Sequence, residues 1–425
     1  MKLNYAGKQR AQQGSVLVIT LVIAALFGTF LFGYLQAVRS QDTLVVRSQA
    51  WNGALGLAEA GVEEALAQLN PGAPQQVVDR TANGWGPATA GGLYGPITRT
   101  LSSGTYSVLY TDDAYPVIYS RGRVAVPSIS ATISRTLRVA VTNYPLFMVG
   151  IAARNGIDLA GNKVDIDSFN SADPNLSLNG RYSAAKASTN GDIASFAGVV
   201  NVSSATVQGD VFLGPTASEE IKKNGVITGG VYNDFNLEFE SVVLPATSSS
   251  WSQASKGSTV INGRTYDYAF MLSGDYTIPS SGNIYVAPGA TVRVKVTDNK
   301  FTATYIEVDG TGLNSGSLAI YMTGQSFTLS GKAIVDGGVA KNLSYYGTDS
   351  NTIINVTGNA DFTGTIYAPN ADFTLGGGGT DNYDFVGASV TKTLKLNGHF
   401  HFHFDEDLLK HGPFSGYVAS TWDEI

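Results

Sequence analysis

The chain has no cysteine, and this absence sets the first limits on its chemistry. Disulfide bonds, thiolate metal sites and cysteine nucleophiles are all excluded, so burial alone has to hold the fold together. Charged residues make up only 14% of the chain, and the formal net charge is −7. Since an acidic protein has no electrostatic means of gripping phosphates, we expect no nucleic-acid partner.

Charge and proline are also missing from the first part of the sequence. Residues 11–38 contain no charged side chain, and no proline occurs before Pro71. The run over 16–38 is almost wholly apolar, and about 20 such residues in a helix match the ~30 Å hydrocarbon core of a bilayer. It exceeds the roughly 7–15 apolar residues of a secretory signal, and no Ala-x-Ala cleavage site follows it. We therefore predict a transmembrane segment over 16–38.

The charges around this segment predict its orientation. Lys2, Lys8 and Arg10 precede the apolar run. Positive residues favour the cytoplasmic side of a membrane, so the N-terminus is expected there. Everything from Arg39 onward then lies outside the cytosol.

Helical spacing continues beyond the apolar run and ends at Asn70-Pro71-Gly72, a strong helix stop. Apolar residues recur at i, i+3, i+4 and i+7 over Trp51, Ala54, Leu55, Ala58, Val62, Ala65, Leu66 and Leu69. The sequence therefore predicts one long helix over 15–70. Its second apolar stripe packs either on a sheet of the same chain or on neighbouring subunits.

The run from Gln12 to Leu21, QQGSVLVITL, resembles the N-terminus of type IV pilin-like proteins, particularly the PilX-type minor pilins. The stretch over 58–66, AEAGVEEAL, is similar to the second helical half of those proteins. The resemblance implies a leader over 1–14, cut by a prepilin peptidase after Gly14 so that Ser15 becomes the new N-terminus. It also implies an inner-membrane, single-pass protein with a periplasmic or extracellular body, which joins a pilus with other pilin-like subunits.

One departure from the family pattern refines this expectation. Major pilins carry glutamate at the fifth mature position, whereas this chain has Ile19 there. The resemblance therefore points to a minor, tip-like subunit or a pseudopilin. The side chains expected to face the bilayer or other pilin helices are apolar residues of the first helical half: Val16, Leu17, Leu21, Leu26, Leu31 and Leu35. A static membrane-anchored envelope protein, structural or adhesive, is the alternative.

The rest of the chain predicts a mainly β protein, since 49 glycines separate short runs of β-branched and aromatic residues. Residues 71–143 are expected to hold a linker and a small antiparallel sheet. Over 144–405 the turns recur about every 20 residues, as in Gly191-Asp192 and Gly209-Asp210. This spacing favours a right-handed parallel β-helix, a solenoid, with a pair of β-sandwiches as the alternative. The end of this region resembles β-helical ectodomains fused to PilX-type anchors and, less closely, bactofilin-like polymer-forming domains. Residues 406–425 are expected to form a C-terminal tail.

All four histidines lie near the end of the chain, three of them in His399-Phe400-His401-Phe402-His403. Their period of two places His399, His401 and His403 on one face of a strand and the phenylalanines on the other. Same-face neighbours are about 6.5–7 Å apart, so two of them are able to share a Zn²⁺ ion but three on a flat strand are strained. We predict a terminal strand without metal, and no cofactor.

A catalytic function is the third alternative. β-Helical polysaccharide lyases need acidic residues beside a basic one, and Lys163, Arg181, Arg293 and Lys295 are the basic candidates. No sequence pattern pairs them with carboxylates. We therefore predict a non-enzymatic subunit whose head serves adhesion or assembly, with a surface polysaccharide as a candidate partner.

Overall fold

The computed structural model describes residues 13–70, 84–86, 88–89, 91–113, 115–126, 130–161, 164–222, 224–237, 239–358, 361–377, 383–397 and 399–425, with side chains from Val16 onward. Residues 1–12 of the leader expected over 1–14, and most of the expected linker, lie outside these residues. The chain forms two compact units. The first unit comprises 1–68, 79–142 and 419–425, and the second comprises 69–78 and 143–418.

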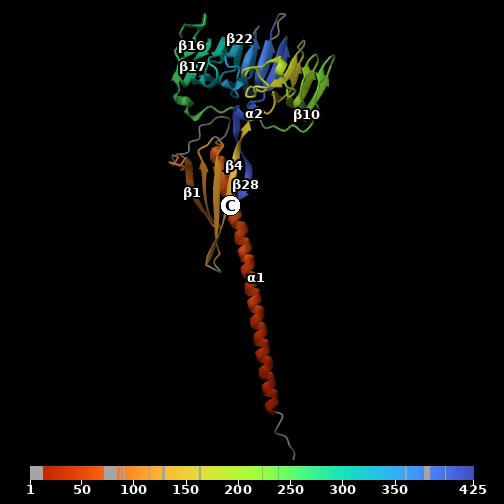
Figure 1. Ribbon diagram of the computed structural model, residues 1–425, viewed down its shortest axis with the longest axis vertical. Coiled ribbons are helices and arrows are strands. Elements are labelled where there is room, and N and C mark those ends of the chain that lie inside the picture. The colour runs from red at the N-terminus through yellow and green to blue at the C-terminus, as the bar shows by residue number, and fades with distance from the viewer. Residues whose placement is uncertain are drawn as a thin grey trace, which may run out of the picture. The chain divides into compact units, whose positions relative to one another are not determined.

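The first unit is built on one long helix, α1 (Gln13–Leu69), drawn in red in Figure 1. It begins and ends within two residues of the predicted bounds. The absence of proline before Pro71 allows its backbone hydrogen bonds to run unbroken for 57 residues. The long N-terminal helix is thus confirmed.

A five-stranded sheet completes the first unit, in the order β1-β2-β3-β4-β28. The pairs β1–β2, β2–β3 and β3–β4 are antiparallel, which confirms the small antiparallel sheet. Residues 406–425 differ from the expected tail, because they contain a short helix, α2 (Leu408–His411), and the edge strand of this sheet. The strands are β1 (Leu93–Leu101), β2 (Gly104–Thr111), β3 (Val117–Val126), β4 (Ala131–Pro145) and β28 (Phe414–Glu424).

The second half of α1 packs on this sheet through small side chains. Ala54, Ala58, Val62 and Ala65 are fully buried, as the stripe predicted from their spacing requires. Close approach depends on Gly122 of β3, where a Cβ atom would lie 2.0 Å from the carbonyl oxygen of Ala54 and 2.6 Å from the amide nitrogen of Ala58. The alternative in which this stripe packs on neighbouring subunits is therefore not needed.

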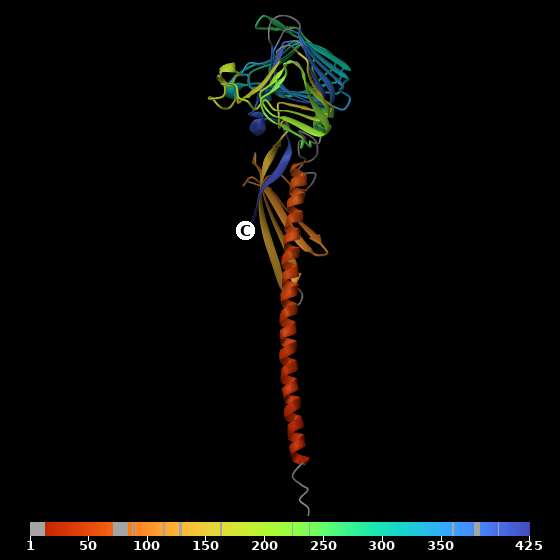
Figure 2. The same ribbon diagram turned by 90° about the vertical axis from the view of Figure 1, so that its right-hand side faces the viewer.

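The second unit is dominated by a sheet of 21 strands, and every pairing described between these strands is parallel. Figure 2 shows them curving around a common interior as a small barrel. The strands are β5 (Ile151–Ala153), β6 (Ile157–Leu159), β7 (Asp165–Phe169), β8 (Ile193–Val202), β9 (Thr206–Val207), β10 (Val211–Ile221), β11 (Val226–Ile227), β12 (Val231–Tyr232), β13 (Ser252–Gln253), β16 (Tyr268–Phe270), β17 (Gly274–Ile278), β18 (Ile284–Val286), β19 (Thr291–Val296), β20 (Lys300–Val308), β21 (Ser317–Met322), β22 (Ser326–Val335), β23 (Leu343–Gly347), β24 (Ile353–Thr357), β25 (Phe362–Gly376), β26 (Tyr383–Asn397) and β27 (Phe400–Asp405).

Smaller elements lie between these strands. The hairpin of β14 (Thr259–Ile261) and β15 (Arg264–Tyr266) is a separate antiparallel pair. Among the described residues, four short 3₁₀ helices occupy turns of this unit: η2 (Ala184–Lys186), η3 (Ala246–Ser250), η4 (Gly312–Asn314) and η5 (Ala340–Asn342).

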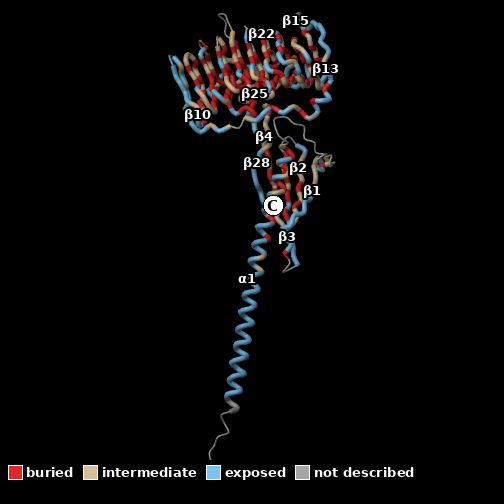
Figure 3. The backbone as a smooth tube through the Cα atoms, turned by 180° about the vertical axis from the view of Figure 1, so that it is seen from behind, coloured by how far each residue is buried: buried red, intermediate tan, exposed pale blue. Residues whose placement is uncertain are grey.

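The interior of the large sheet is apolar, and it appears as red bands in the second unit in Figure 3. Aromatic rings stack between paired strands: the ring centroids of Phe362 and Phe385 are 4.7 Å apart, and those of Phe385 and Phe402 are 4.5 Å apart. Phe400 and Phe402 of β27 lie in this inner core, as the period of two predicted, whereas Phe404 belongs to a second apolar cluster.

The strands do not stack in chain order. We call β5–β12 the early strands and β13–β27 the late strands. The early strands end at Tyr232, and the late strands begin at Ser252. The late strands then build toward β26 and β27, which pair with the early strands β5, β6 and β7. We call this junction the seam.

The segment 233–251 links the two sets of strands along the outer face of the sheet. Trp251 is 8% exposed, and its ring lies 5.9 Å from that of Tyr321. Phe235 and Phe239 pack in the same apolar cluster. The cluster lies on the outer face because its members, such as Ala152, alternate along their strands with residues of the inner core.

The repeated Gly-Asp pairs stack on one another, as their spacing suggested. Asp192 Oδ1 accepts a hydrogen bond from the amide of Asp210 at 2.7 Å, and Asp210 Oδ1 accepts one from the amide of Gly230 at 2.7 Å. A Cβ atom on Gly209 would lie 2.6 Å from the backbone of Gly191, so only glycine fits this approach. Each aspartate thus satisfies a turn amide of the next strand.

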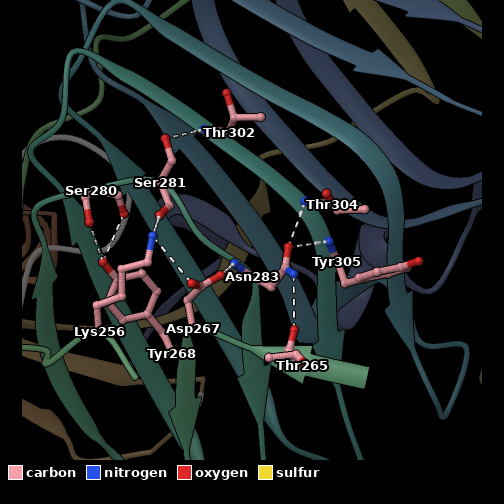
Figure 4. Close-up of polar contacts among 10 residues, drawn as sticks. All are labelled: Lys256, Thr265, Asp267, Tyr268, Ser280, Ser281, Asn283, Thr302, Thr304 and Tyr305. Atoms are coloured by element: carbon pink, nitrogen blue, oxygen red, sulfur yellow. Dashed lines mark hydrogen bonds and ion pairs between the residues drawn. The ribbon is translucent and has the colours of Figure 1, made fainter. Parts of the chain in front are cut away.

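Asn283 accepts hydrogen bonds from backbone amides of a neighbouring late strand in the same way (Figure 4). Its Oδ1 accepts hydrogen bonds from the amides of Thr304 at 2.8 Å and Tyr305 at 3.0 Å. The backbone amide of Asn283 donates to Asp267 Oδ2 at 2.8 Å, and its side-chain Nδ2 donates to the carbonyl of Thr265 at 3.1 Å. Polar side chains at the turns therefore hold successive strands in register.

We expect Gly122→Ala to destabilise the first unit by about 1–3 kcal/mol, because the added methyl group meets the backbone of α1 rather than a side chain that can rotate away. Thermal unfolding of the full chain in detergent micelles measures this loss. Gly56→Ala is the matched control, since nothing lies within 4 Å of its Cβ position. In a helix it should stabilise by about 1 kcal/mol. Equal effects of the two variants would show that α1 does not press on β3.

Candidate functional site

The first half of α1 is an apolar helix that no other described part of the chain covers. All described side chains from Val16 to Asp42 are exposed, as the pale blue stretch of α1 in Figure 3 shows. The six predicted membrane or assembly residues are among them: Val16 is 60% exposed, Leu17 68%, Leu21 67%, Leu26 52%, Leu31 60% and Leu35 49%. The structure thus places these residues on a free helix surface rather than in a core.

This surface is apolar around the whole helix and not along one stripe. Phe27, Phe30 and Phe32 point in different directions on successive turns and are each more than 60% exposed. Within the described residues, α1 is the one helix long and apolar enough to cross a membrane. Each large apolar side chain gains about 1.5–3 kcal/mol when it leaves water, so this half of α1 requires lipid or protein around it.

Polar contacts mark the point where α1 passes from its exposed half to its packed half. The guanidinium of Arg135 lies 4.8 Å from the ring centroid of Trp51 and forms an ion pair with Glu424 of β28. Farther along, Glu64 accepts hydrogen bonds from Arg99 at 2.6 Å and Tyr106 at 2.8 Å. Burial alone would raise the pKa of Glu64, but these hydrogen bonds outweigh it and hold the pKa below its ordinary value. The second half of α1 is therefore fixed to its own sheet.

The predicted processing residues, Gly14 and Ser15, lie in the first turn of α1. Their side chains are outside the described part of the chain. Cleavage after Gly14 stays a prediction.

The histidines are spread over different environments. His403 is buried, whereas His399 and His401 are half-buried and His411 is 53% exposed. His403 Nδ1 lies 2.5 Å from Asp167 Oδ1, and its Nε2 lies 3.3 Å from Asp384 Oδ1. Both ring nitrogens of His403 thus face carboxylates. Sequence reasoning missed this cluster, because Asp167 lies 236 residues before His403 and only the seam brings them together.

The histidines of β27 do not converge on one point. Among the described residues, no group of three or more histidine or carboxylate side chains gathers in an arrangement able to hold an ion. The ring centroids of His401 and His403 are 6.2 Å apart, as expected for neighbours on one strand face. The ring of His403 is instead stacked against Tyr182, with centroids 3.5 Å apart.

The basic residues considered for polysaccharide cleavage are engaged in separate structural contacts. Arg293 forms an ion pair with Asp275, Lys295 donates to the carbonyl of Ser248, and Arg181 donates to the carbonyl of Asp336. Lys163 lies outside the described residues. The structure does not assemble the three described residues into one acid and base constellation.

Comparisons with known proteins give little further guidance. Residues 240–411, less than half of the chain, match a family model described as a domain of unknown function, DUF7305. No curated protein matches the chain. The chain aligns with the crystal structure of the competence-associated pilin ComZ from Thermus thermophilus at 11% identity, covering 88% of this chain and 97% of that chain, with a TM-score of 0.30. A TM-score this low carries no argument about fold or function.

Charged residues introduced into the exposed apolar half of α1 should weaken its retention in a membrane. We expect the double variant Leu21→Arg, Leu26→Arg to lose retention in the membrane fraction, since each arginine costs about 2.5–3.5 kcal/mol at the centre of a membrane helix. Alkaline extraction of cell membranes measures retention. Gln41→Arg, Gln49→Arg is the matched control on exposed positions of the same helix. Retention of the first variant at the wild-type level would mean that this helix does not anchor the chain.

We expect zinc to leave the melting temperature of the full chain unchanged at neutral pH, because His399, His401 and His403 do not converge. Thermal unfolding in micelles with and without added Zn²⁺ measures this. A rise in melting temperature that disappears in His401→Ala would contradict the absence of a metal site.

Proposed function

We propose that the protein is a minor, tip-like pilin or pseudopilin, a structural subunit that carries its second unit as the head of a type IV pilus or a related filament. One observation supports this most strongly. The first half of α1 is apolar on every side and exposed, whereas the second half is fixed to an antiparallel sheet of the same chain. Such a helix is suited to lie first in lipid and then among the helices of other subunits.

The N-terminal sequence supports the same proposal. The leader-like run before Ser15 and the stretch over 58–66 resemble PilX-type minor pilins. Ile19 takes the place of a glutamate that would neutralise the amine of a neighbouring subunit, which favours a tip position over a repeating one. In this proposal the partners are the inner membrane, a prepilin peptidase and other pilin-like subunits.

We also propose that the large sheet is one β-helix, in which each coil covers the apolar edge of the one before it. Three series of parallel pairs support this. One series links β17, β19, β21, β23 and β25, a second links β16, β18, β20 and β22, and a third links β20, β22, β24 and β25. Strands within a series are joined along the chain by one circuit of about 20 residues, as a solenoid requires. Such a head offers long outer faces for adhesion, with a surface polysaccharide as the candidate ligand.

N-terminal sequencing of the protein from cells with and without prepilin peptidase tests the proposed function. We expect a mature chain that begins at Ser15 when the peptidase is present and an uncleaved chain when it is absent. Gly14→Leu should block cleavage in the presence of the peptidase, and Gly7→Leu is the matched control outside the cleavage site. A chain that keeps its leader in all these cells would favour a static membrane anchor and would overturn the pilin proposal.

A further inference from the structure

The seam is where the large sheet closes, and it holds a buried titratable cluster that the proposed function does not use. On one side are β26 and β27, which end the late strands, and on the other are β5, β6 and β7, which begin the early strands. His403 of β27 lies directly across from Asp167 of β7 in this pairing. The side chains of His403 and Asp167 are only 4% and 3% exposed.

The contacts around His403 come from both sides of the seam. Asp167 and Tyr182 belong to the early side, and the hydroxyl of Tyr182 donates to Asp167 Oδ2 at 2.7 Å. Asp384 belongs to β26 on the late side. The imidazole is therefore placed between two carboxylates, with Nδ1 facing Asp167 at 2.5 Å and Nε2 facing Asp384 at 3.3 Å.

This geometry depends on a proton. A neutral imidazole has one N–H donor and one bare nitrogen, whereas an imidazolium donates from both nitrogens. If His403 is neutral and donates to Asp167, the lone pair of its Nε2 faces the Asp384 carboxylate oxygen. Only the protonated ring satisfies both carboxylates, and a buried polar group that loses its partner costs about 1–3 kcal/mol.

We propose that His403 is a proton-linked lock on the seam: its imidazolium bridges Asp167 and Asp384 and holds the early strands to the late ones, and loss of its proton loosens that junction. The lock is closed in mildly acidic surroundings and weakens as the pH rises through neutrality. This inference concerns the large sheet alone and does not depend on pilin assembly.

The electrostatics of the site agree with this direction. Burial would lower the pKa of His403, but its contacts with the carboxylates of Asp167 and Asp384 outweigh burial and raise the pKa above the ordinary value. A raised folded-state pKa means that the stabilisation is complete below about pH 6.5, the value for an unfolded chain, and is lost as pH rises through the folded-state pKa. Burial opposes the ionisation of Asp384 too, yet its contact with His403 leaves its pKa below the ordinary value.

Other titratable groups lie near His403. His401 of the same strand and Asp165 of β7 also face the cluster. Two residues along, burial raises the pKa of Asp405 to about 6. The stabilisation from protonated Asp405 is therefore lost between about pH 4 and pH 6, below the range in which His403 acts.

Hydrogen exchange of the full chain in detergent micelles between pH 6 and pH 8.5 tests the lock. We expect the protection factor of 165–169, in β7, to fall with rising pH by at most about tenfold per pH unit, since one proton is linked to the opening. Residues 291–296, in β19 away from the seam, provide the internal reference. A parallel fall of both segments would overturn the proposal.

Asp384→Asn and His403→Gln identify the group responsible. Asp384 is 44% exposed, so its replacement should leave the fold intact while it removes the second carboxylate, and the fall in protection with pH should then disappear. His411→Gln is the matched control, because His411 also pairs with a carboxylate, Asp407, but is 53% exposed. It should keep the wild-type pH dependence. A wild-type fall that persists in Asp384→Asn would also overturn the proposal.

The titration of His403 itself gives a readout that does not depend on any variant being folded. In NMR spectra of histidine-labelled wild-type protein, one ring should titrate at a higher pH than an ordinary histidine. In the spectrum of Asp384→Asn, no ring should titrate at that higher pH. Four rings that all titrate at or below about pH 6.5 would contradict a proton held in the seam.

Discussion

The structure depends on one unsatisfied requirement, which is that the first half of α1 packs against no apolar surface among the described residues of its own chain. The exposed residues run from Val16 to Val38 without a charge, so neither water nor a surface ion pair satisfies them. The second half is different, because small residues such as Ala54 and Ala58 let the helix press on β3 at Gly122. The first half of the helix is thus an exposed apolar surface, and the second half is packed on a sheet. Any functional state of the protein has to surround the first half with lipid or apolar protein and leave the packing of the second half intact.

The path of the chain places a second constraint on the molecule. The last strand of the five-stranded sheet, β28, follows all strands of the large sheet in the sequence. Arg135 and Arg138 of β4 form ion pairs with Glu424 and Asp423 of β28. The large sheet is also completed by strands from late in the sequence, because β5, β6 and β7 pair with β26 and β27. Both units therefore need the C-terminal end of the chain for completion. In a chain without cysteine, these late contacts are held by strand pairing, burial and ion pairs alone.

The sequence was most informative where a pattern acts over short distances. The helix bounds followed from the absence of proline and the stop at Asn70, the packed stripe followed from spacing, and the inward phenylalanines of β27 followed from a period of two. The stacking of Asp192 on Asp210 was visible as an 18-residue echo. The order of the strands within the large sheet could not be predicted, because the pairing of β27 with β7 joins residues more than 200 positions apart and leaves no local pattern in the sequence. The same reason applies to β28, whose partner strand β4 ends more than 250 residues earlier in the chain.

The seam shows why a polar cluster stands where an apolar one would be expected. Elsewhere in the large sheet, paired strands meet through stacked rings such as Phe385 and Phe402, which accept any partner of the right shape. A buried histidine between two carboxylates is less tolerant, because a shift of one residue along β7 would turn Asp167 to the other face of the strand and place Ile166 or Ser168, neither of them a carboxylate, opposite His403. Burial of unpaired charge costs several kcal/mol, so a misaligned seam is penalised far more than a misaligned apolar pair. The cluster therefore gives the last strand of the sheet a single register.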